Sequence, residues 1–94
     1  MTLRVELRPA AERDLDRLVV FMAKLDERAA DRRERWLRES IRKLGDRPLM
    51  GRPGPRSSLR ERVLKYGRSS YLVRYRVTDE ALVVLRIWHG KEDR

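Results

Sequence analysis

Residues able to carry out acid–base and phosphate chemistry gather in the second half of the chain. His89, the only histidine, ends an apolar run, and Glu61 lies in an earlier run of alternating residues. Arg74 and Arg76 are two positions apart in a strand-like segment, so both should lie on one face of a sheet. Cleavage of a phosphodiester without a metal needs a base, an acid and cations that hold the phosphate. The candidate catalytic set is therefore His89, Glu61, Arg74 and Arg76.

Each member of this set also has a simpler structural interpretation. A lone histidine beside Trp88 at the end of a strand is more often a packing or hydrogen-bonding residue. Glu61 stands between Arg60 and Arg62 and can be their surface partner. The remaining arginines can form a solvated face, or one that a partner covers. On the residue pattern alone, the structural interpretation is the stronger one for each of these residues.

The composition limits the kinds of site that the chain can build. With 94 residues the chain is one domain, residues 1–94. It has no cysteine and a single histidine, which excludes disulfides and thiolate or zinc sites, so no metal or cofactor is expected. No apolar stretch approaches the roughly 18 residues that span a bilayer. The N-terminus has acidic residues where a signal peptide is apolar. We expect a cytoplasmic protein without membrane contact.

The charge of the chain indicates a polyanionic partner. Lys and Arg number 24 against 15 acidic residues, giving a net charge of +9. This excess predicts attraction to nucleic acid or to an acidic protein. Most of the basic residues are arginine, which suits bidentate contacts to carboxylate or phosphate. A simple nucleic-acid-binding module fits the charge. A recognition-helix pattern and surface aromatics that stack on bases are not seen in the sequence.

The first half of the chain predicts a strand and two helices. Leu3 to Leu7 alternates apolar and charged residues, as in a half-buried strand. An amphipathic helix follows from Pro9 to about Lys24, and a second runs from about Glu27 to Leu44, where Gly45 ends it. The short connection predicts an antiparallel helical hairpin whose two apolar stripes need a sheet to cover.

The second half predicts three strands. Arg47 to Ser58 is rich in proline and glycine and should be one long loop. Strands are expected at Leu59 to Tyr66, Tyr71 to Thr78 and Ala81 to Trp88, with short turns between them. The order is β-α-α-β-β-β. We therefore expect an α+β fold in which the helical hairpin packs on one face of a mostly antiparallel four-stranded sheet.

This order of elements, at this length, resembles the RelE/ParE superfamily of type II toxin–antitoxin toxins. Three stretches carry the resemblance. The first is the opening LRPAAERDLDRL, the second is the loop LMGRPGPR, and the third is the C-terminal GRSSYLVRYRVTDEALVVLRIWHGKED. One departure is Arg8, which stands where many relatives have a Ser or Thr helix cap.

The resemblance implies one of two activities on the same fold. RelE-like members are ribosome-dependent endoribonucleases that cut mRNA, whereas ParE-like members poison DNA gyrase by binding. Leu72 follows Tyr71 where RelE-like enzymes carry an arginine, and the chain stops at Arg94 without a further tyrosine. The ending WHGKED is typical of ParE-like relatives. These features favour the gyrase poison, which acts by binding, so no catalytic residues are expected; the catalytic set named above applies only if the chain is a ribonuclease. The ribonuclease is the alternative, and the nucleic-acid-binding module is a lesser one.

The resemblance also implies two protein contacts. Basic residues of the sheet and tail are candidates for contact with gyrase: Arg74, Arg86, Lys91 and Arg94. Relatives are neutralised by the acidic C-terminal segment of a DNA-binding antitoxin. Arginines on the polar faces of the two helices are candidates for its carboxylates: Arg13, Arg17, Arg32 and Arg35.

Overall fold

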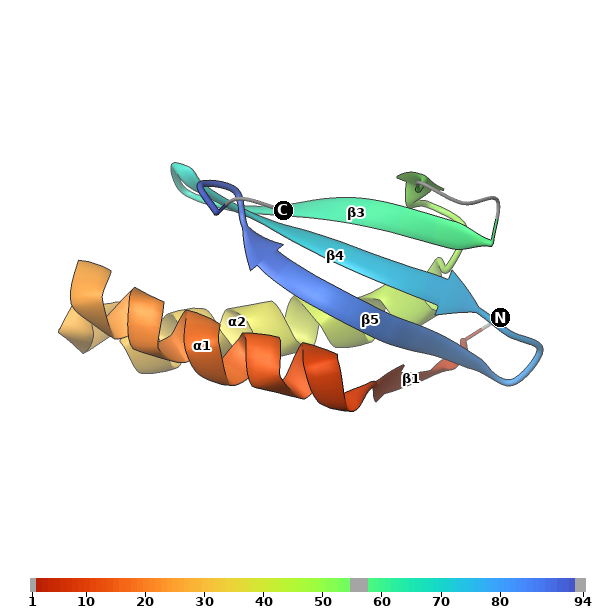
Figure 1. Cartoon of the computed structure of the whole chain (residues 1–94), viewed down its shortest axis with the longest axis horizontal. Coiled ribbons are helices and arrows are strands. Elements are labelled where there is room, and N and C mark those ends of the chain that lie inside the picture. Colours follow the sequence, from red (N-terminus) through yellow and green to blue (C-terminus); the bar gives the residue numbers. More distant parts are fainter. Residues whose placement is uncertain (1, 55–57, 93–94) are drawn as a thin grey trace.

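The computed structural model describes residues 2–54 and 58–92. One sheet has the strand order β1-β5-β4-β3-β2, and two helices cover one of its faces (Figure 1). The strands are β1 (Arg4–Leu7), β2 (Arg52–Pro53), β3 (Leu59–Tyr66), β4 (Ser69–Val77) and β5 (Ala81–His89). The helices are α1 (Pro9–Leu25) and α2 (Ala30–Lys43), with the 3-10 turns η1 (Glu27–Ala29) and η2 (Leu44–Asp46) before and after α2.

The predicted α+β fold with a helical hairpin on one sheet face is confirmed, but the sheet has five strands instead of four. The additional strand is β2, which lies inside the predicted loop and pairs with only two residues of β3. The sheet is mixed because β1 runs parallel to β5, whereas the other neighbouring strands are antiparallel. β2 is too short to show a strand pattern in the sequence, and its pairing comes from tertiary contact alone.

The helices form where the apolar spacing predicted them. α1 buries Leu15, Leu18 and Met22 on one side, and α2 buries Leu37 and Ile41 on the side that faces them. Each such side chain contributes roughly 1.5–3 kcal/mol by leaving water. The sheet completes the core with residues of β4 and β5: Tyr71, Val73, Tyr75, Leu82, Val84 and Ile87. In the described part of the chain no helix is long and apolar enough to cross a membrane.

A bulge in β5 adjusts which of its residues face the helices. Arg74 lies opposite Arg86 and Tyr75 lies opposite Val84, which leaves Leu85 as an extra residue in β5. The extra residue reverses the alternation at that point. Val84 and Ile87 therefore share the helix-facing side although they are three positions apart.

β1 covers only the first half of β5. The parallel pairing runs from Arg4 opposite Ala81 to Leu7 opposite Val84. The amide of Arg8 still donates to the carbonyl of Val84 at 2.9 Å, and the chain then turns into α1. Beyond this point the edge of β5 faces the side chains of α1 instead of a strand. The backbone groups on that edge must find side-chain partners.

Candidate functional site

Asp14 of α1 lies at the edge of β5 that β1 leaves uncovered, and it accepts a hydrogen bond from the backbone there. Its side chain is buried, with 2% of the residue exposed. Oδ2 accepts from the backbone amide of Ile87 at 2.8 Å and from Nε of Arg86 at 2.8 Å. Oδ1 accepts from Nη1 of Arg17 at 2.6 Å and from Nη2 of Arg86 at 3.1 Å. One carboxylate therefore replaces the missing strand neighbour and holds two arginines.

The same network ties the C-terminal turn to α1. Arg17 donates to both carboxylate oxygens of Glu92, at 2.9 and 3.1 Å, and to the carbonyl of Ile87 at 3.1 Å. Oε1 of Glu92 also accepts from the backbone amide of His89 at 2.7 Å. We call the set Asp14, Arg17, Arg86 and Glu92 the edge network. It connects α1, β5 and the residues that follow β5.

Both carboxyl groups of the edge network stay ionised at neutral pH. Burial alone would raise the pKa of Asp14, but hydrogen bonds from Arg86 and Arg17 and from the Ile87 amide bring that pKa below its ordinary value of 3.8. Burial would likewise raise the pKa of Glu92. The hydrogen bonds from Arg17 and from the His89 amide instead keep the pKa of Glu92 below 4.5.

His89 is a buried packing residue on the helix-facing side of the sheet. Its ring lies 4.8 Å from that of Phe21 and 5.1 Å from that of Tyr71, between centroids. Nδ1 accepts from the backbone amide of Lys91 at 3.1 Å, so the neutral ring carries its proton on Nε2. Nε2 and the Tyr71 hydroxyl have no hydrogen-bond partner among residues 2–54 and 58–92. Burial is the main reason that the pKa of His89 lies below 6.5.

Glu61 lies on the other face of the sheet, turned away from the helices. Oε2 of Glu61 accepts from Nε and Nη2 of Arg74 at 2.9 and 2.7 Å, and Arg52 lies 3.7 Å from Oε1. The guanidinium groups of Arg74 and Arg86 lie 4.9 and 5.1 Å from the centroid of Trp88. This part of the outer face therefore combines paired charges with an indole ring.

The structure does not bring the four candidate catalytic residues together. His89 faces the helices, whereas Glu61 and Arg74 form an ion pair on the outer face. Arg76 is exposed on that outer face, and Leu72 is buried there with 3% exposed. A phosphate could not contact His89 and Glu61 at once. In the described residues no three acidic or histidine side chains are grouped so that they could hold a metal ion.

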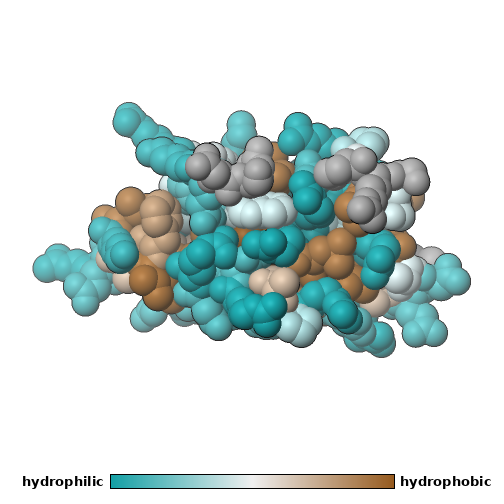
Figure 2. Space-filling model, in the orientation of Figure 1, coloured by the Kyte–Doolittle hydropathy of each residue, from teal (hydrophilic) through white to brown (hydrophobic). Residues whose placement is uncertain are grey.

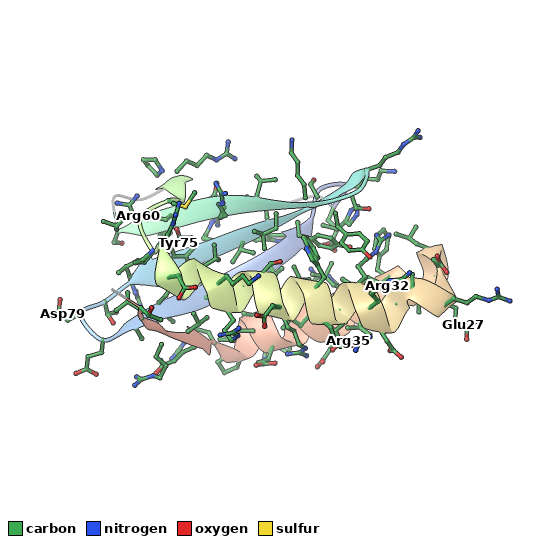
Figure 3. The ribbon with its side chains drawn as sticks, turned by 180° about the vertical axis from the view of Figure 1, so that it is seen from behind. Glu27, Arg32, Arg35, Arg60, Tyr75 and Asp79 are labelled. Carbon is green, nitrogen blue, oxygen red and sulfur yellow. The ribbon has the colours of Figure 1, made fainter. Side chains whose placement is uncertain are left out.

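All four arginines proposed for antitoxin binding are exposed, but three of them differ from Arg17 in their ion pairs. Arg13 is exposed on α1, and Arg32 and Arg35 are exposed along α2 toward η1 (Figure 3). Among the residues that the structure describes, these three form no ion pair. Arg17 differs because its guanidinium already binds Asp14 and Glu92.

The candidates for target contact divide in the same way. Arg74 and Arg86 are bound to carboxylates of the chain itself, whereas the side chain of Lys91 is exposed. Arg94 lies outside the described residues. The face shown in Figure 2 is mostly hydrophilic, in keeping with the high charge of the chain.

The sequence did not predict that hydrogen bonds from Tyr75 and Arg60 hold the loop before β2. The Tyr75 hydroxyl donates to the carbonyl of Pro48 at 2.8 Å and accepts from the amide of Gly51 at 2.9 Å. Arg60 donates to the carbonyls of Leu49 and Gly51 at 3.3 and 3.0 Å. Figure 3 shows Arg60 and Tyr75 side by side at the end of the molecule away from Arg32. The only sequence signal was a tyrosine on the core side of a strand, whose hydroxyl needs a partner.

Comparison with known proteins places the chain among toxins. A family model described as "ParE toxin of type II toxin-antitoxin system, parDE" matches residues 5–94. The chain is 39% identical to "Toxin RelE1" of Caulobacter vibrioides, over the whole of both chains. It is 33% identical to "Toxin RelE3" of the same organism, over 96% of this chain and 97% of the relative. A solved structure described as "Chromosomal ParDE TA system from P. aeruginosa" has the same fold, with a TM-score of 0.75, 21% identity and coverage of 92% and 94% of the two chains.

Proposed function

Because the chain belongs to the ParE toxin family of type II toxin–antitoxin systems, we propose that it acts as a toxin that poisons DNA gyrase. It would bind gyrase and stabilise the gyrase–DNA cleavage complex, so that double-strand breaks accumulate. The observation that supports binding over cleavage is the separation of His89 and Glu61 on opposite faces of the sheet. An inhibitor that binds needs a surface and does not need an acid, a base and a phosphate clamp in one place.

The basic residues of the tail, Lys91 and Arg94, are the proposed contact with gyrase. Lys91 is the sharpest probe, because its side chain is exposed while Arg74 and Arg86 are engaged within the chain. Its backbone amide holds His89, but alanine keeps that amide, so Lys91→Ala changes the side chain alone. Lys24→Ala, in the last turn of α1, is the matched control.

The test adds the purified chain to gyrase and supercoiled plasmid. We expect gyrase-dependent linear DNA, reduced several-fold by Lys91→Ala and unchanged by Lys24→Ala. In parallel the chain is added to translating ribosomes. Cleavage of mRNA at the ribosomal A site, without any effect on gyrase, would overturn the proposal.

A ribosome-dependent mRNA endoribonuclease is the second candidate function. The observation that favours it is that the two curated relatives carry the name RelE. On this alternative, cations of the outer face such as Arg76 would bind the phosphate, and Arg76→Ala would abolish mRNA cleavage. The translation assay decides between the two functions directly.

The partner that we propose for neutralisation is a cognate antitoxin with an acidic segment. Arg13, Arg32 and Arg35 present guanidinium groups that no carboxylate of the described residues neutralises. Such groups suit carboxylates of a partner. Co-expression with the small gene beside the toxin gene should give a complex whose dissociation constant rises with salt. A complex that never forms would contradict this pairing.

A further inference from the structure

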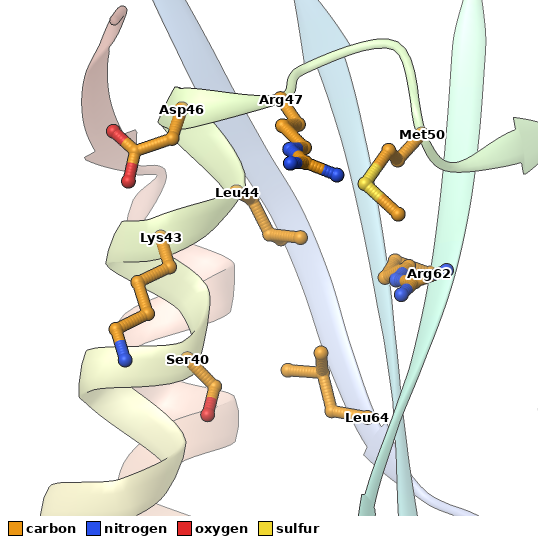
Figure 4. A pocket seen from close by; sticks show the side chains of 8 residues that line it. All are labelled: Ser40, Lys43, Leu44, Asp46, Arg47, Met50, Arg62 and Leu64. Atoms are coloured by element: carbon orange, nitrogen blue, oxygen red, sulfur yellow. The ribbon is translucent and has the colours of Figure 1, made fainter.

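A pocket on the helix-facing side of the sheet lies apart from the edge network and from the outer face. It is bounded by the C-terminal end of α2, the loop before β2 and strand β3 (Figure 4). Its volume is about 340 Å³, which lies in the range of small-molecule sites. Leu44 and Leu64 line it with apolar side chains, and Met50, which is 48% exposed, forms one side. The pocket is therefore large enough for a small organic molecule.

The chain itself holds the walls of this pocket in place. The loop before β2 is fixed from the sheet by the hydrogen bonds of Tyr75 and Arg60. Within the loop the amide of Arg47 donates to the carbonyl of Leu44 at 3.2 Å, and the amide of Met50 donates to the carbonyl of Arg47 at 3.1 Å. A ligand would therefore not need to order the loop, and this lowers the cost of binding.

Two arginines of this pocket have no carboxylate partner. Arg47 reaches it from the loop and Arg62 from β3 (Figure 4). Among residues 2–54 and 58–92 neither forms an ion pair. Arg62 is also half-buried. Arginine is seldom buried without a partner, because an unpaired charge loses its solvation there. The two guanidinium groups therefore suit an anion from outside the chain.

The other charged groups around the pocket leave this positive charge largely unbalanced. The carboxylate of Asp46 points away from the two arginines in Figure 4, and it accepts from the Thr2 hydroxyl at 3.2 Å. Lys43 is exposed, and its ammonium group points away from Arg62 in the same view. The negative C-terminal end of α2 offsets roughly half a unit of charge. Of the two positive charges on Arg47 and Arg62, about one and a half units therefore remain.

We propose that this pocket binds a small phosphate monoester with an apolar or planar body. At neutral pH such a phosphate carries a charge of about −1.5 to −2, which matches the excess of positive charge, whereas a carboxylate supplies a single negative charge. The planar guanidinium groups of Arg47 and Arg62 suit phosphate oxygens, and the Ser40 hydroxyl is a further donor. Leu44 and Leu64 contact the body of the ligand. The proposal goes beyond the toxin function and holds whichever target the toxin has.

Titration of the unchanged chain with phenyl phosphate, followed by NMR of the backbone amides, tests the site. This probe combines the phosphate dianion with an apolar ring. Inorganic phosphate has the charge without the ring, and benzoate has the ring with a single charge. We expect each of these two to bind about tenfold more weakly than phenyl phosphate. The amides of Met50 and Leu64 should shift with phenyl phosphate, whereas the amide of Gly67 in the β3–β4 turn should not.

Arg62→Gln removes the half-buried cation, and Arg68→Gln is the matched control. Both variants lose one positive charge, but Arg68 is exposed in the β3–β4 turn and does not line the pocket. The dissociation constant for phenyl phosphate should rise about tenfold for Arg62→Gln and less than about twofold for Arg68→Gln. No ion pair of the described chain depends on Arg62, so Arg62→Gln should fold, which urea unfolding checks.

Met50→Ala tests the contact with the body of the ligand. Alanine removes apolar surface from one side of the pocket and leaves both arginines in place. It should weaken phenyl phosphate by about threefold or more and leave inorganic phosphate unchanged. An equal effect on both probes would contradict the apolar contact.

Three outcomes would refute the site. If phenyl phosphate does not shift the amides of the pocket, no such ligand binds there. If Arg68→Gln weakens binding as much as Arg62→Gln does, the net charge of +9 attracts the anion without a site. If benzoate binds as tightly as phenyl phosphate, the pocket does not select for phosphate.

Competition against phenyl phosphate identifies the source of the phosphate group. The two competitors are a nucleoside monophosphate and an oligonucleotide that ends in a phosphate. Displacement by the nucleoside monophosphate supports a free small molecule as the ligand. Displacement by the oligonucleotide alone would assign the pocket to the ends of nucleic acids and would overturn the proposal.

Discussion

Replacement of Asp14 should cost far more stability than replacement of Asp16, although both lie in one turn of α1. Asp16 is exposed, whereas Asp14 is buried and accepts four hydrogen bonds. The change from aspartate to alanine alters the intrinsic helix propensity equally at both positions. The difference between the two losses of stability therefore measures the contacts of the Asp14 carboxylate.

The magnitude follows from the partners that Asp14→Ala leaves behind. The amide of Ile87 is buried and loses its acceptor, which costs about 1–3 kcal/mol. The side chains of Arg17 and Arg86 are 41% and 44% exposed, so they return to water. Ion pairs that open to solvent contribute about 0–1 kcal/mol each. The expected loss is therefore about 3 kcal/mol, against at most about 0.5 kcal/mol for Asp16→Ala.

Urea unfolding, followed by the fluorescence of Trp36 and Trp88, measures both variants. For a domain of this size a loss of about 3 kcal/mol lowers the melting temperature by roughly 10–25 °C. If Asp14→Ala and Asp16→Ala lose the same free energy of unfolding within about 0.5 kcal/mol, the edge network does not stabilise the fold.

The pH dependence gives a second check on the same residue. The pKa of Asp14 is lower in the folded chain than its ordinary value of 3.8, despite burial, because arginines and an amide stabilise the ionised form. A carboxyl with a lowered folded pKa contributes stability that is present above the unfolded pKa and is lost as the pH falls through the folded pKa. The difference between the unchanged chain and Asp14→Asn should therefore be constant from about pH 7 to 5 and shrink below about pH 4.

Three further expectations concern Tyr75, its contact with Gly51, and His89. Tyr75→Phe should cost about 1–3 kcal/mol, because the buried Gly51 amide loses its acceptor, and limited proteolysis should cut residues 47–54 faster. Gly51→Ala should be less harmful with Tyr75→Phe than without it, because its Cβ would overlap the Tyr75 hydroxyl, and a double-mutant cycle measures this. Burial is the main cause that lowers the pKa of His89; Lys91 and Arg33 lower it further, whereas Glu92 raises it. Because the folded pKa lies below the unfolded one, the stability of the fold should decrease as the pH drops below about 6.5. NMR titration of this single histidine at or above that value would contradict the burial argument.

The sequence predicted the elements because their hydrophobic periods are strong and local. The stripe of Leu15, Leu18 and Met22, and the alternation from Tyr71 to Val77, each have one arrangement that buries apolar surface. β2 was missed because two residues show no period. Its pairing to β3 depends on the loop that Tyr75 holds, and such tertiary pairing is invisible in a local pattern.

The side-chain partners were the part that local reasoning could not supply. Glu61 was expected to pair with Arg60 or Arg62, but neighbours in a strand point to opposite faces, so it pairs across the sheet with Arg74. In the sequence, Asp14 is one more charged residue of a predicted helix, with Arg13 and Leu15 as its neighbours. It is buried only because β1 ends at Leu7 and leaves an edge of β5 for it to cover.

The edge network changes how the positive charge of the chain should be interpreted. Arg17 and Arg86 were chosen as contacts for different partners, yet both bind Asp14, and replacement of either one removes part of the hydrogen bonding of a buried carboxylate. The arginines are partly exposed, but the carboxylate is buried, and the loss of a donor by a buried acceptor costs about 1–3 kcal/mol. Loss of toxicity or of antitoxin binding in these two variants would therefore combine a loss of stability with any lost contact. Among the described cations, exposed ones without an ion pair, such as Arg32 and Lys91, are those whose replacement can report on binding alone.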